Sequence, residues 1–138
     1  MNKFIVTQIL LLLISISFTT VNAQDSTAED YFKKGDYYYR NADYKLAIPE
    51  FNKVLDLEPD HINALLQRGF CKNINKDYPG AIADFSKVIE LKPDHRWAYT
   101  SRGSARNKTG EYALAIDDFN KALEYDPTDQ EAYNNRGF

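Results

Sequence analysis

Apolar and aromatic side chains recur from residue 28 onward with the spacing of amphipathic helices. Between residues 44 and 55 the apolar positions lie three or four residues apart or side by side: Tyr44, Ala47, Ile48, Phe51, Val54 and Leu55. That spacing places them on one face of a helix, whereas a half-buried strand would alternate. The pattern returns twice, at steps of 34 residues, around Ala81 and Ala115. A fixed period of this length predicts a stack of short supersecondary units.

Prolines and glycines fall at fixed positions in each unit. Three prolines follow the apolar stripes, where each is expected to end a helix: Pro59, Pro93 and Pro127. Four glycines lie within the preceding helices: Gly35, Gly69, Gly103 and Gly137. A glycine inside a helix costs about 1 kcal/mol relative to alanine, so we expect a neighbouring helix to approach closely there. The small residues expected on that neighbour are Ala47, Ala81 and Ala115. Each unit is therefore predicted to be two antiparallel helices joined by a tight turn.

Polar residues that favour helix starts stand before each expected helix. We expect their side chains to accept hydrogen bonds from backbone N–H groups of the first turn. The expected caps are Ser26 or Thr27 for the opening helix, Asp43 and Asp77 for second helices, and Asp60, Asp94 and Thr128 for later first helices. Pro49 lies inside a second helix, where proline costs roughly 3 kcal/mol or kinks the helix. We therefore expect that helix to bend.

The first 23 residues have the layout of a secretory signal peptide. Lys3 gives a positive start, an apolar run extends to Phe18, and the small residues Val21 and Ala23 precede a cleavage site before Gln24. A membrane anchor is the alternative, but the run is shorter than the roughly 20 apolar residues of a spanning helix. We therefore expect an exported protein, periplasmic or secreted. The expected organisation is a signal peptide (1–23), a polar lead (24–27), three repeats (28–61, 62–95 and 96–129) and a partial fourth repeat (130–138).

The repeats resemble the tetratricopeptide repeat. In the first unit the resemblance rests on Tyr31, the glycine four residues later, the pair Ala47 and Phe51, and the closing Pro59. It extends over residues 28–138, and it implies an all-α fold, a right-handed superhelix of three repeats plus the start of a fourth. We expect residues 130–138 to begin a longer array, and a docked closing half-repeat is the alternative.

Charge and composition argue against several functions. The formal net charge is −3 and the basic residues are scattered, so neither nucleic acid nor an anionic membrane surface is an expected partner. The two histidines, His61 and His95, occupy equivalent turns and should lie too far apart to share a metal. Most of the carboxylates are expected to form solvated helix faces, and Cys71 is expected to be buried between units. The sequence therefore predicts a protein that is not an enzyme and that uses no cofactor.

One face of the first helices is left over once the core positions are assigned. In the resembled family the first helices line a concave groove that contacts peptides, so the resemblance implies that this face is a binding site. The expected groove residues are Phe32, Asp36, Tyr39, Asn63, Leu66, Phe70, Asn73, Trp97, Thr100, Ser104, Asn107 and Lys108. Phe32, Phe70 and Trp97 would act as apolar anchors. The alternative is that these rings cover irregular packing between units.

The expected function is a non-enzymatic scaffold that binds a peptide or protein segment in this groove. One subclass of the family grips the C-terminal carboxylate of chaperone tails with lysine, asparagine and arginine side chains. The corresponding positions here carry Phe32, Asp36, Gln67, Trp97 and Ser101, so no chaperone-tail clamp is expected. The alternative function is a structural spacer or oligomerisation module of a longer envelope protein, self-associating through residues 130–138. Handling of carbohydrate or lipid is a weaker alternative, because only surface aromatics favour it.

Overall fold

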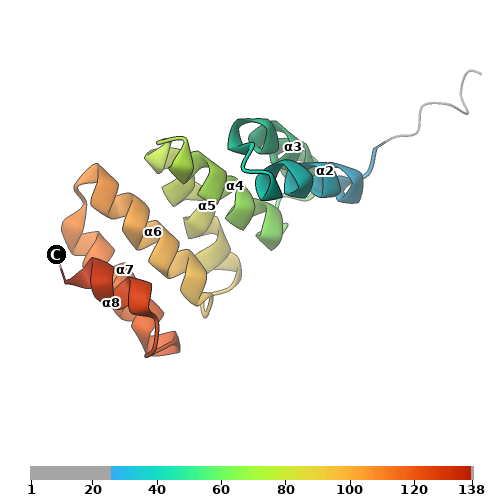
Figure 1. Cartoon of the computed structure of the whole chain (residues 1–138). Coiled ribbons are helices and arrows are strands. Elements are labelled where there is room, and N and C mark those ends of the chain that lie inside the picture. The colour runs from blue at the N-terminus through green and yellow to red at the C-terminus, as the bar shows by residue number, and fades with distance from the viewer. Residues whose placement is uncertain (1–25, 138) are drawn as a thin grey trace, which may run out of the picture.

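The computed structural model describes residues 26–137, and the expected signal peptide lies outside this range. Seven α-helices and no strands occupy the described residues (Figure 1). The helices are α2 (Ala28–Arg40), α3 (Tyr44–Leu57), α4 (Ile62–Ile74), α5 (Tyr78–Leu91), α6 (Arg96–Thr109), α7 (Tyr112–Tyr125) and α8 (Gln130–Arg136). They confirm the predicted all-α superhelix of three helical hairpins plus part of a fourth.

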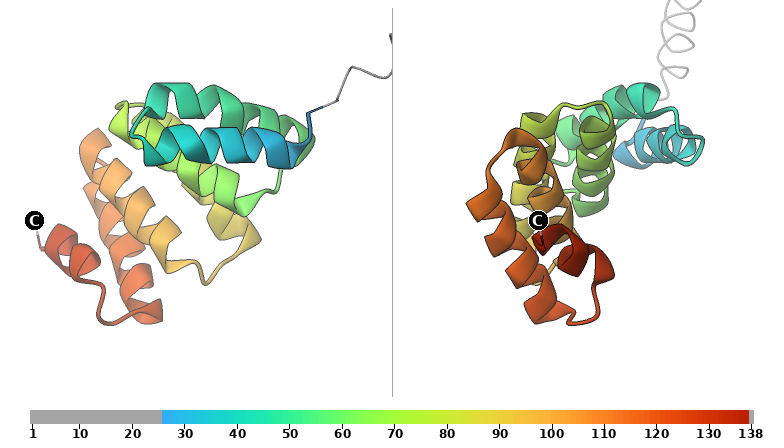
Figure 2. Two further views of the ribbon diagram at one scale, coloured as in Figure 1. Left: turned by 45° about the vertical axis from the view of Figure 1, so that its right-hand side comes forward. Right: turned by 60° about the vertical axis from the view of Figure 1, so that its left-hand side comes forward.

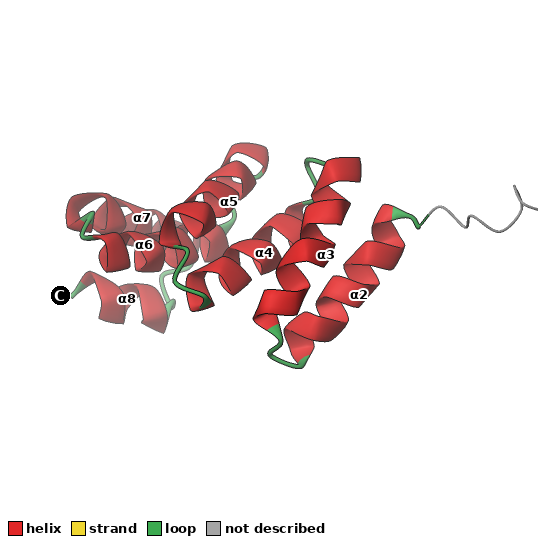
Figure 3. Cartoon of the chain, turned by 90° about the horizontal axis from the view of Figure 1, so that it is seen from above, coloured by secondary structure: helices red, strands yellow, loops and turns green. Residues whose placement is uncertain are grey.

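The hairpins stack in an order that separates the helices into an inner and an outer row. Each helix packs on the next one in the chain, and in addition α2 contacts α4, α4 contacts α6, and α6 contacts α8. No such contact joins the second helices α3, α5 and α7 of the described residues to one another. The first helices therefore form the inner row, and successive hairpins turn relative to each other along the stack (Figures 2 and 3).

A phenylalanine from each second helix forms the centre of the core. Phe51, Phe85 and Phe119 are fully buried and follow the 34-residue period. A Cβ added to the glycine of the same repeat would lie 2.7–2.8 Å from the ring: Gly35 against Phe51, Gly69 against Phe85 and Gly103 against Phe119. The glycines thus permit a close helix approach, as predicted. The atoms nearest to each missing Cβ belong to a phenylalanine ring, rather than to the expected Ala47, Ala81 or Ala115.

The helix caps differ from the prediction by one residue in the later repeats. His61 and His95, rather than Asp60 and Asp94, accept hydrogen bonds through Nδ1 from the N–H of the third residue of α4 and α6. In the same way Asp129 replaces the expected Thr128 at α8. Each of these helices begins one residue later than predicted. The residue directly after each proline still belongs to the turn, so the next residue becomes the cap. The histidines are therefore capping residues rather than merely polar turn residues.

Of the other expected caps, those at α2 and α5 form and the one at α3 does not. Thr27 and Asp30 form a reciprocal capping box at α2, and Asp77 accepts a hydrogen bond from the N–H of Gly80 at α5. Asp43 makes no side-chain capping bond, so that expectation is wrong. Helix α3 continues through Pro49 to Leu57.

A column of acidic residues on the second helices is buried, an exception to the expectation that most carboxylates form solvated faces. Its members are Glu50, Asp84 and Asp118. Arg68 and Lys72 of α4 reach Asp84 at 2.6 and 3.0 Å, and Arg102 and Arg106 of α6 both reach Asp118 at 2.7 Å. In the first repeat Lys34 and Lys53 pair with Glu50. Buried carboxylates are stable in the core because each has two cationic partners.

Cys71 lies in the core cluster shared by the first two repeats, as predicted. Its side chain is fully buried, and burial raises the pKa of the thiol to about 12. A buried neutral thiol acts as a small apolar residue rather than as a nucleophile.

Candidate functional site

Three hollows lie along the inner row of helices and join into one continuous groove. The first, between α2 and α4, is lined by Phe32, Asp36, Arg40, Asn63, Leu66 and Gln67. The central one is lined by Tyr39, Leu66, Gln67, Phe70, Asn73, Phe85, His95, Trp97, Ser101, Ser104 and Glu131. The third is lined by Ser104, Asn107, Lys108, Tyr112 and Asn135. Leu66 and Gln67 belong to the first two hollows and Ser104 to the last two, so we call the whole surface the inner groove.

All of the expected groove residues except Thr100 line the inner groove. The side chain of Thr100 is only 1% exposed, and its hydroxyl donates a 2.8 Å hydrogen bond to Asp129. Asp129 in turn caps α8 through the N–H of Ala132. Thr100 therefore fixes α8 against α6 and offers no contact to a ligand.

Two of the three expected aromatic anchors are open to solvent. Trp97 is 55% exposed and Phe70 is 36% exposed. Phe70 is held edge-on against Tyr39 and Tyr44, with ring centroids 5.5 and 5.7 Å away, so its orientation is set by packing between the first two repeats.

Phe32, the third expected anchor, is only partly exposed. Its ring lies 5.9 Å from that of Phe51 and 4.8 Å from that of His61. Phe32 therefore combines a position in the groove with a packing role, as the alternative interpretation of these aromatic side chains foresaw.

The polar groups of the first hollow are tied together across the helix boundary. Asp36 pairs with Arg40 of its own helix at 2.7 Å and accepts a 2.9 Å hydrogen bond from Nε2 of Gln67 on α4. Oε1 of Gln67 and Oδ1 of Asn73 are buried without a hydrogen-bond partner in the protein. Buried carbonyl oxygens of this kind retain their capacity to accept a hydrogen bond from a ligand.

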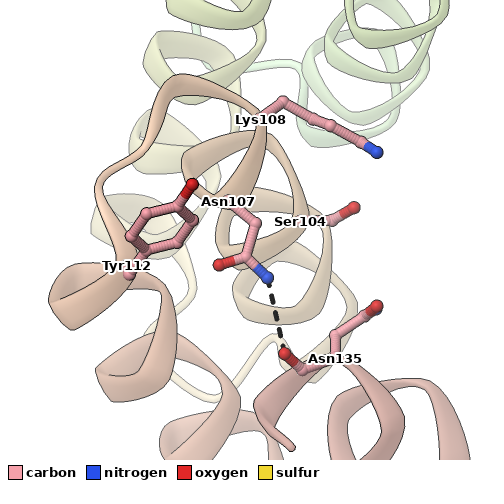
Figure 4. A pocket seen from close by; sticks show the side chains of 5 residues that line it. All are labelled: Ser104, Asn107, Lys108, Tyr112 and Asn135. Carbon is pink, nitrogen blue, oxygen red and sulfur yellow. Dashed lines mark hydrogen bonds between the residues drawn. The ribbon is translucent and has the colours of Figure 1, made fainter. Parts of the chain in front are cut away.

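Helix α8 completes the far end of the groove. Figure 4 shows Nδ2 of Asn107 donating to the backbone oxygen of Asn135, at 3.4 Å, while Lys108 extends away from this contact. The third hollow, which these residues line, has a volume of about 520 Å³. This volume is within the usual range of ligand pockets.

The structure adds groove residues that sequence reasoning did not place there. Gln67, Ser101 and Asn135 line the groove at one position of the 34-residue period, on α4, α6 and α8. The resemblance to the family placed Gln67 and Ser101 at positions of the chaperone-tail clamp, and neither residue was among the predicted groove residues. The helical spacing could have identified this column, since Gln67 lies one turn after the expected groove residue Asn63. Glu131 of α8 was not foreseen.

Within residues 26–137 no group of His, Cys, Asp and Glu side chains is arranged to hold a metal ion. In the same range no helix combines the length and the apolar character needed to cross a membrane.

Two segments of the chain, residues 28–61 and 97–129, match models of the tetratricopeptide repeat. No curated protein sequence matches the chain. The solved structures it resembles include the first tetratricopeptide domain of Spaghetti (RPAP3) bound to the HSP90 peptide SRMEEVD, with a TM-score of 0.77, 26% identity, and coverage of 80% of this chain and 88% of that one.

Two structures with lower sequence identity to this chain share the fold. MamA gives a TM-score of 0.80 at 23% identity over 86% of this chain and 70% of its own. YrrB, described as a tetratricopeptide protein with an unusual peptide-binding site, gives 0.79 at 18% identity over 98% and 70%. The chain therefore contains tetratricopeptide repeats, arranged in the superhelix that these structures share.

Proposed function

We propose that the chain is a non-catalytic scaffold that binds an extended segment of a protein or peptide partner in the inner groove. The observation that carries the proposal is the exposure of Trp97 and Phe70 on a groove whose helices are already packed in place. Large aromatic side chains dominate binding energy at interfaces, and a preformed surface loses little conformational freedom on binding. The RPAP3 domain with this fold binds an HSP90 peptide, which supports a peptide ligand as a class.

We further propose that the ligand is not a chaperone tail and that the protein acts outside the cytoplasm. The positions that correspond to the carboxylate clamp carry Phe32, Asp36, Gln67, Trp97 and Ser101, none of which is cationic. The export proposal is supported by the signal-peptide pattern of residues 1–23.

The proposal is tested by pairing two neighbouring aromatic residues. Peptides that bind the purified protein are selected from a random displayed library, and their affinity is measured with Trp97→Ala and Tyr99→Ala. Trp97→Ala should lose about 2 kcal/mol, or roughly thirtyfold in affinity, without a change in thermal midpoint. Tyr99 is buried, and its hydroxyl donates a 3.0 Å hydrogen bond to the backbone oxygen of Pro93. Its removal should therefore lower the thermal midpoint.

Two outcomes would count against the groove. Failure to select any binding peptide would contradict the proposed function. Selection of peptides whose affinity is unaffected by Trp97→Ala would place the binding site elsewhere on the protein.

A second candidate function, self-association, is favoured by the first turns of α7, where Tyr112 borders the third hollow of the inner groove. Tyr112 and Ile116 are 63% and 38% exposed, whereas their counterparts Tyr44 and Ile48 in the first repeat pack against the core cluster that includes α4. An uncovered apolar helix face can bind a second copy of the chain. Sedimentation velocity over a concentration series distinguishes this role from that of a monomeric scaffold.

A further inference from the structure

Five of the six lysines and arginines of α4 and α6 are paired with carboxylates, and the sixth, Lys108, lines the third hollow. Arg68 and Lys72 of α4 are held by Asp84, and Arg102 and Arg106 of α6 by Asp118, at 2.6–3.0 Å. Arg96 pairs with Asp126 at 2.7 Å. Glu131 is the member of the central lining that carries a full charge at neutral pH.

The one histidine in the central lining is neutral at that pH. Nδ1 of His95 accepts the hydrogen bond from the N–H of Ala98, so the ring proton of the neutral form is on Nε2. Burial, and next the charge of Lys92, lower the pKa of His95 below its ordinary value. The lining of the central hollow therefore carries one full charge, the carboxylate of Glu131, and the Arg96 guanidinium that lies over Trp97 is paired with Asp126.

Glu131 is poorly compensated by its own surroundings. Glu131 is exposed, but the surrounding protein atoms partly desolvate its carboxyl group; this desolvation, and next the like charge of Asp129, raise the pKa of Glu131 above its ordinary value. Both effects disfavour the carboxylate form, and a cation brought by a ligand would relieve them.

The hydrogen-bonding groups of the hollow point to the same kind of ligand. The carboxylate of Asp36 can only accept hydrogen bonds, so the amide of Gln67 must direct Nε2 toward it and leave Oε1 free. Oδ1 of Asn73, in the same hollow, is also buried without a partner. Both oxygens are closed to solvent, so they can accept hydrogen bonds from the backbone of a peptide only when the two amide side chains turn toward the hollow.

We propose that the central hollow selects a basic peptide segment, in which a lysine or arginine side chain pairs with Glu131 and apolar neighbours lie on Trp97 and Phe70. The backbone of this segment donates hydrogen bonds to Gln67 and Asn73 once these two amides turn toward the hollow. Trp97 serves in this contact as an apolar surface, because the guanidinium group of Arg96 already lies 4.9 Å from its ring centroid. This proposal rests on the proposed peptide-binding function and specifies its ligand.

The test uses the fact that Trp97 is the only tryptophan of the chain, so intrinsic fluorescence reports on the groove itself. Three peptides with blocked ends, Ac-GSLRLSG-amide and its versions with leucine or glutamate at the centre, are compared with SRMEEVD. Affinities come from the anisotropy of the labelled peptides, and Trp97 fluorescence locates the binding. A charge-assisted hydrogen bond typically contributes enough to change affinity by about tenfold or more. The arginine peptide should therefore bind at least about tenfold more tightly than the leucine and glutamate peptides.

The matched variants are Glu131→Gln and Glu124→Gln. Both remove one negative charge, but Glu124 lies on α7 and pairs with Lys121 at the surface. Glu131→Gln should abolish the preference for arginine, while Glu124→Gln should retain it, with both thermal midpoints unchanged. Equal binding of the three peptides, or an equal effect of the two variants, would overturn the basic-ligand proposal and leave peptide binding intact. Binding of none of the four peptides, with no response of Trp97, would overturn the proposed function as well.

Discussion

Gly35, Gly69 and Gly103 each lie against the ring of a buried phenylalanine, so these positions have the least room in the fold. The atom nearest to a Cβ built on Gly69 is Cε1 of Phe85 at 2.8 Å. Real Cβ contacts are longer, and Phe85 is itself fully buried, so its ring has no free space to move into. Gly137 occupies the same position of the period, but only backbone oxygens lie near it, at 3.7 Å.

This contrast predicts that one added methyl group destabilises the protein at Gly69 but has little effect at Gly137. Gly69→Ala should lower the free energy of unfolding by about 1–3 kcal/mol, because overpacking outweighs the gain of about 1 kcal/mol in helix propensity. Gly137→Ala should leave it within about 0.5 kcal/mol. Urea unfolding of the two variants measures the difference. Equal midpoints would contradict a role for the glycine in helix contact.

Among the helices, α4 and α6 share an uncommon start, because a histidine rather than an aspartate caps each of them. Only the neutral imidazole can accept the capping hydrogen bond, since both nitrogens of the protonated ring are donors. The stability of these helices should therefore depend on pH in a range where an aspartate cap would not. Burial and Lys92 lower the pKa of His95 from its ordinary value of 6.5. On acidification the unfolded chain consequently binds its proton before the folded one does.

His95→Ala is expected to cost about 1 kcal/mol at pH 7.5, the usual effect of removing a cap. Asp94→Ala, at the exposed preceding residue, should change stability by less than about 0.5 kcal/mol. The free energy of unfolding of the unsubstituted protein should fall as the pH is lowered through 6.5.

The variant His95→Asn separates the effect of His95 protonation from other effects of pH. Asparagine caps a helix equally well above and below the pKa of histidine, because its side chain does not titrate. The difference in unfolding free energy between this variant and the unsubstituted protein should shift in favour of the variant as the pH falls. Parallel stability curves for the two proteins would show that protonation of His95 does not affect the helix start.

At the scale of the whole molecule, the 34-residue period was sufficient to predict the hairpins, the superhelix and most of the groove. The groove residues were predictable because every core position recurs at a helical spacing, which leaves a defined face of each first helix unassigned. The caps were displaced because both Asp94 and His95 can accept a capping bond, and the choice depends on where the chain leaves its turn. Thr100 was misplaced because its burial depends on α8, a helix in a different repeat.

The buried acidic column was missed for a different reason. Helical periodicity assigns a charged residue to the solvent face unless the partner across the interface is known. Asp117 and Asp118 are neighbours of the same type, yet Asp117 is exposed and Asp118 is buried against two arginines. Asp118 lies three residues after the buried Ala115 and four before the buried Ala122, but the arginines that compensate its charge belong to α6 and become evident only in space.

The arginines of this network also connect successive repeats. Arg68 binds Asp84 in its own repeat and donates to Asn52 of the preceding one at 2.8 Å. Arg102 repeats the arrangement with Asp118 and Ser86, at 2.7 and 3.0 Å. Each bridge links two second helices, α3 to α5 and α5 to α7. In a stack where stability depends on the interfaces between neighbours, these bridges help to hold the repeats in register.

The adjacent aspartates provide the test of this network. Asp118→Ala leaves Arg102 and Arg106, whose side chains are only 15% and 16% exposed, without their carboxylate. Removing one partner of a buried ion pair typically costs 3–5 kcal/mol, and we expect the lower end of that range because some solvent still reaches both guanidinium groups. Asp117→Ala removes the same charge from the exposed face of the same helix and should cost less than about 0.5 kcal/mol. Urea unfolding at two salt concentrations measures both effects. If the two variants lose equal stability, or if the loss in Asp118→Ala disappears in high salt as for a surface pair, the buried network does not hold the repeats together, and apolar packing around Phe119 alone accounts for the junction.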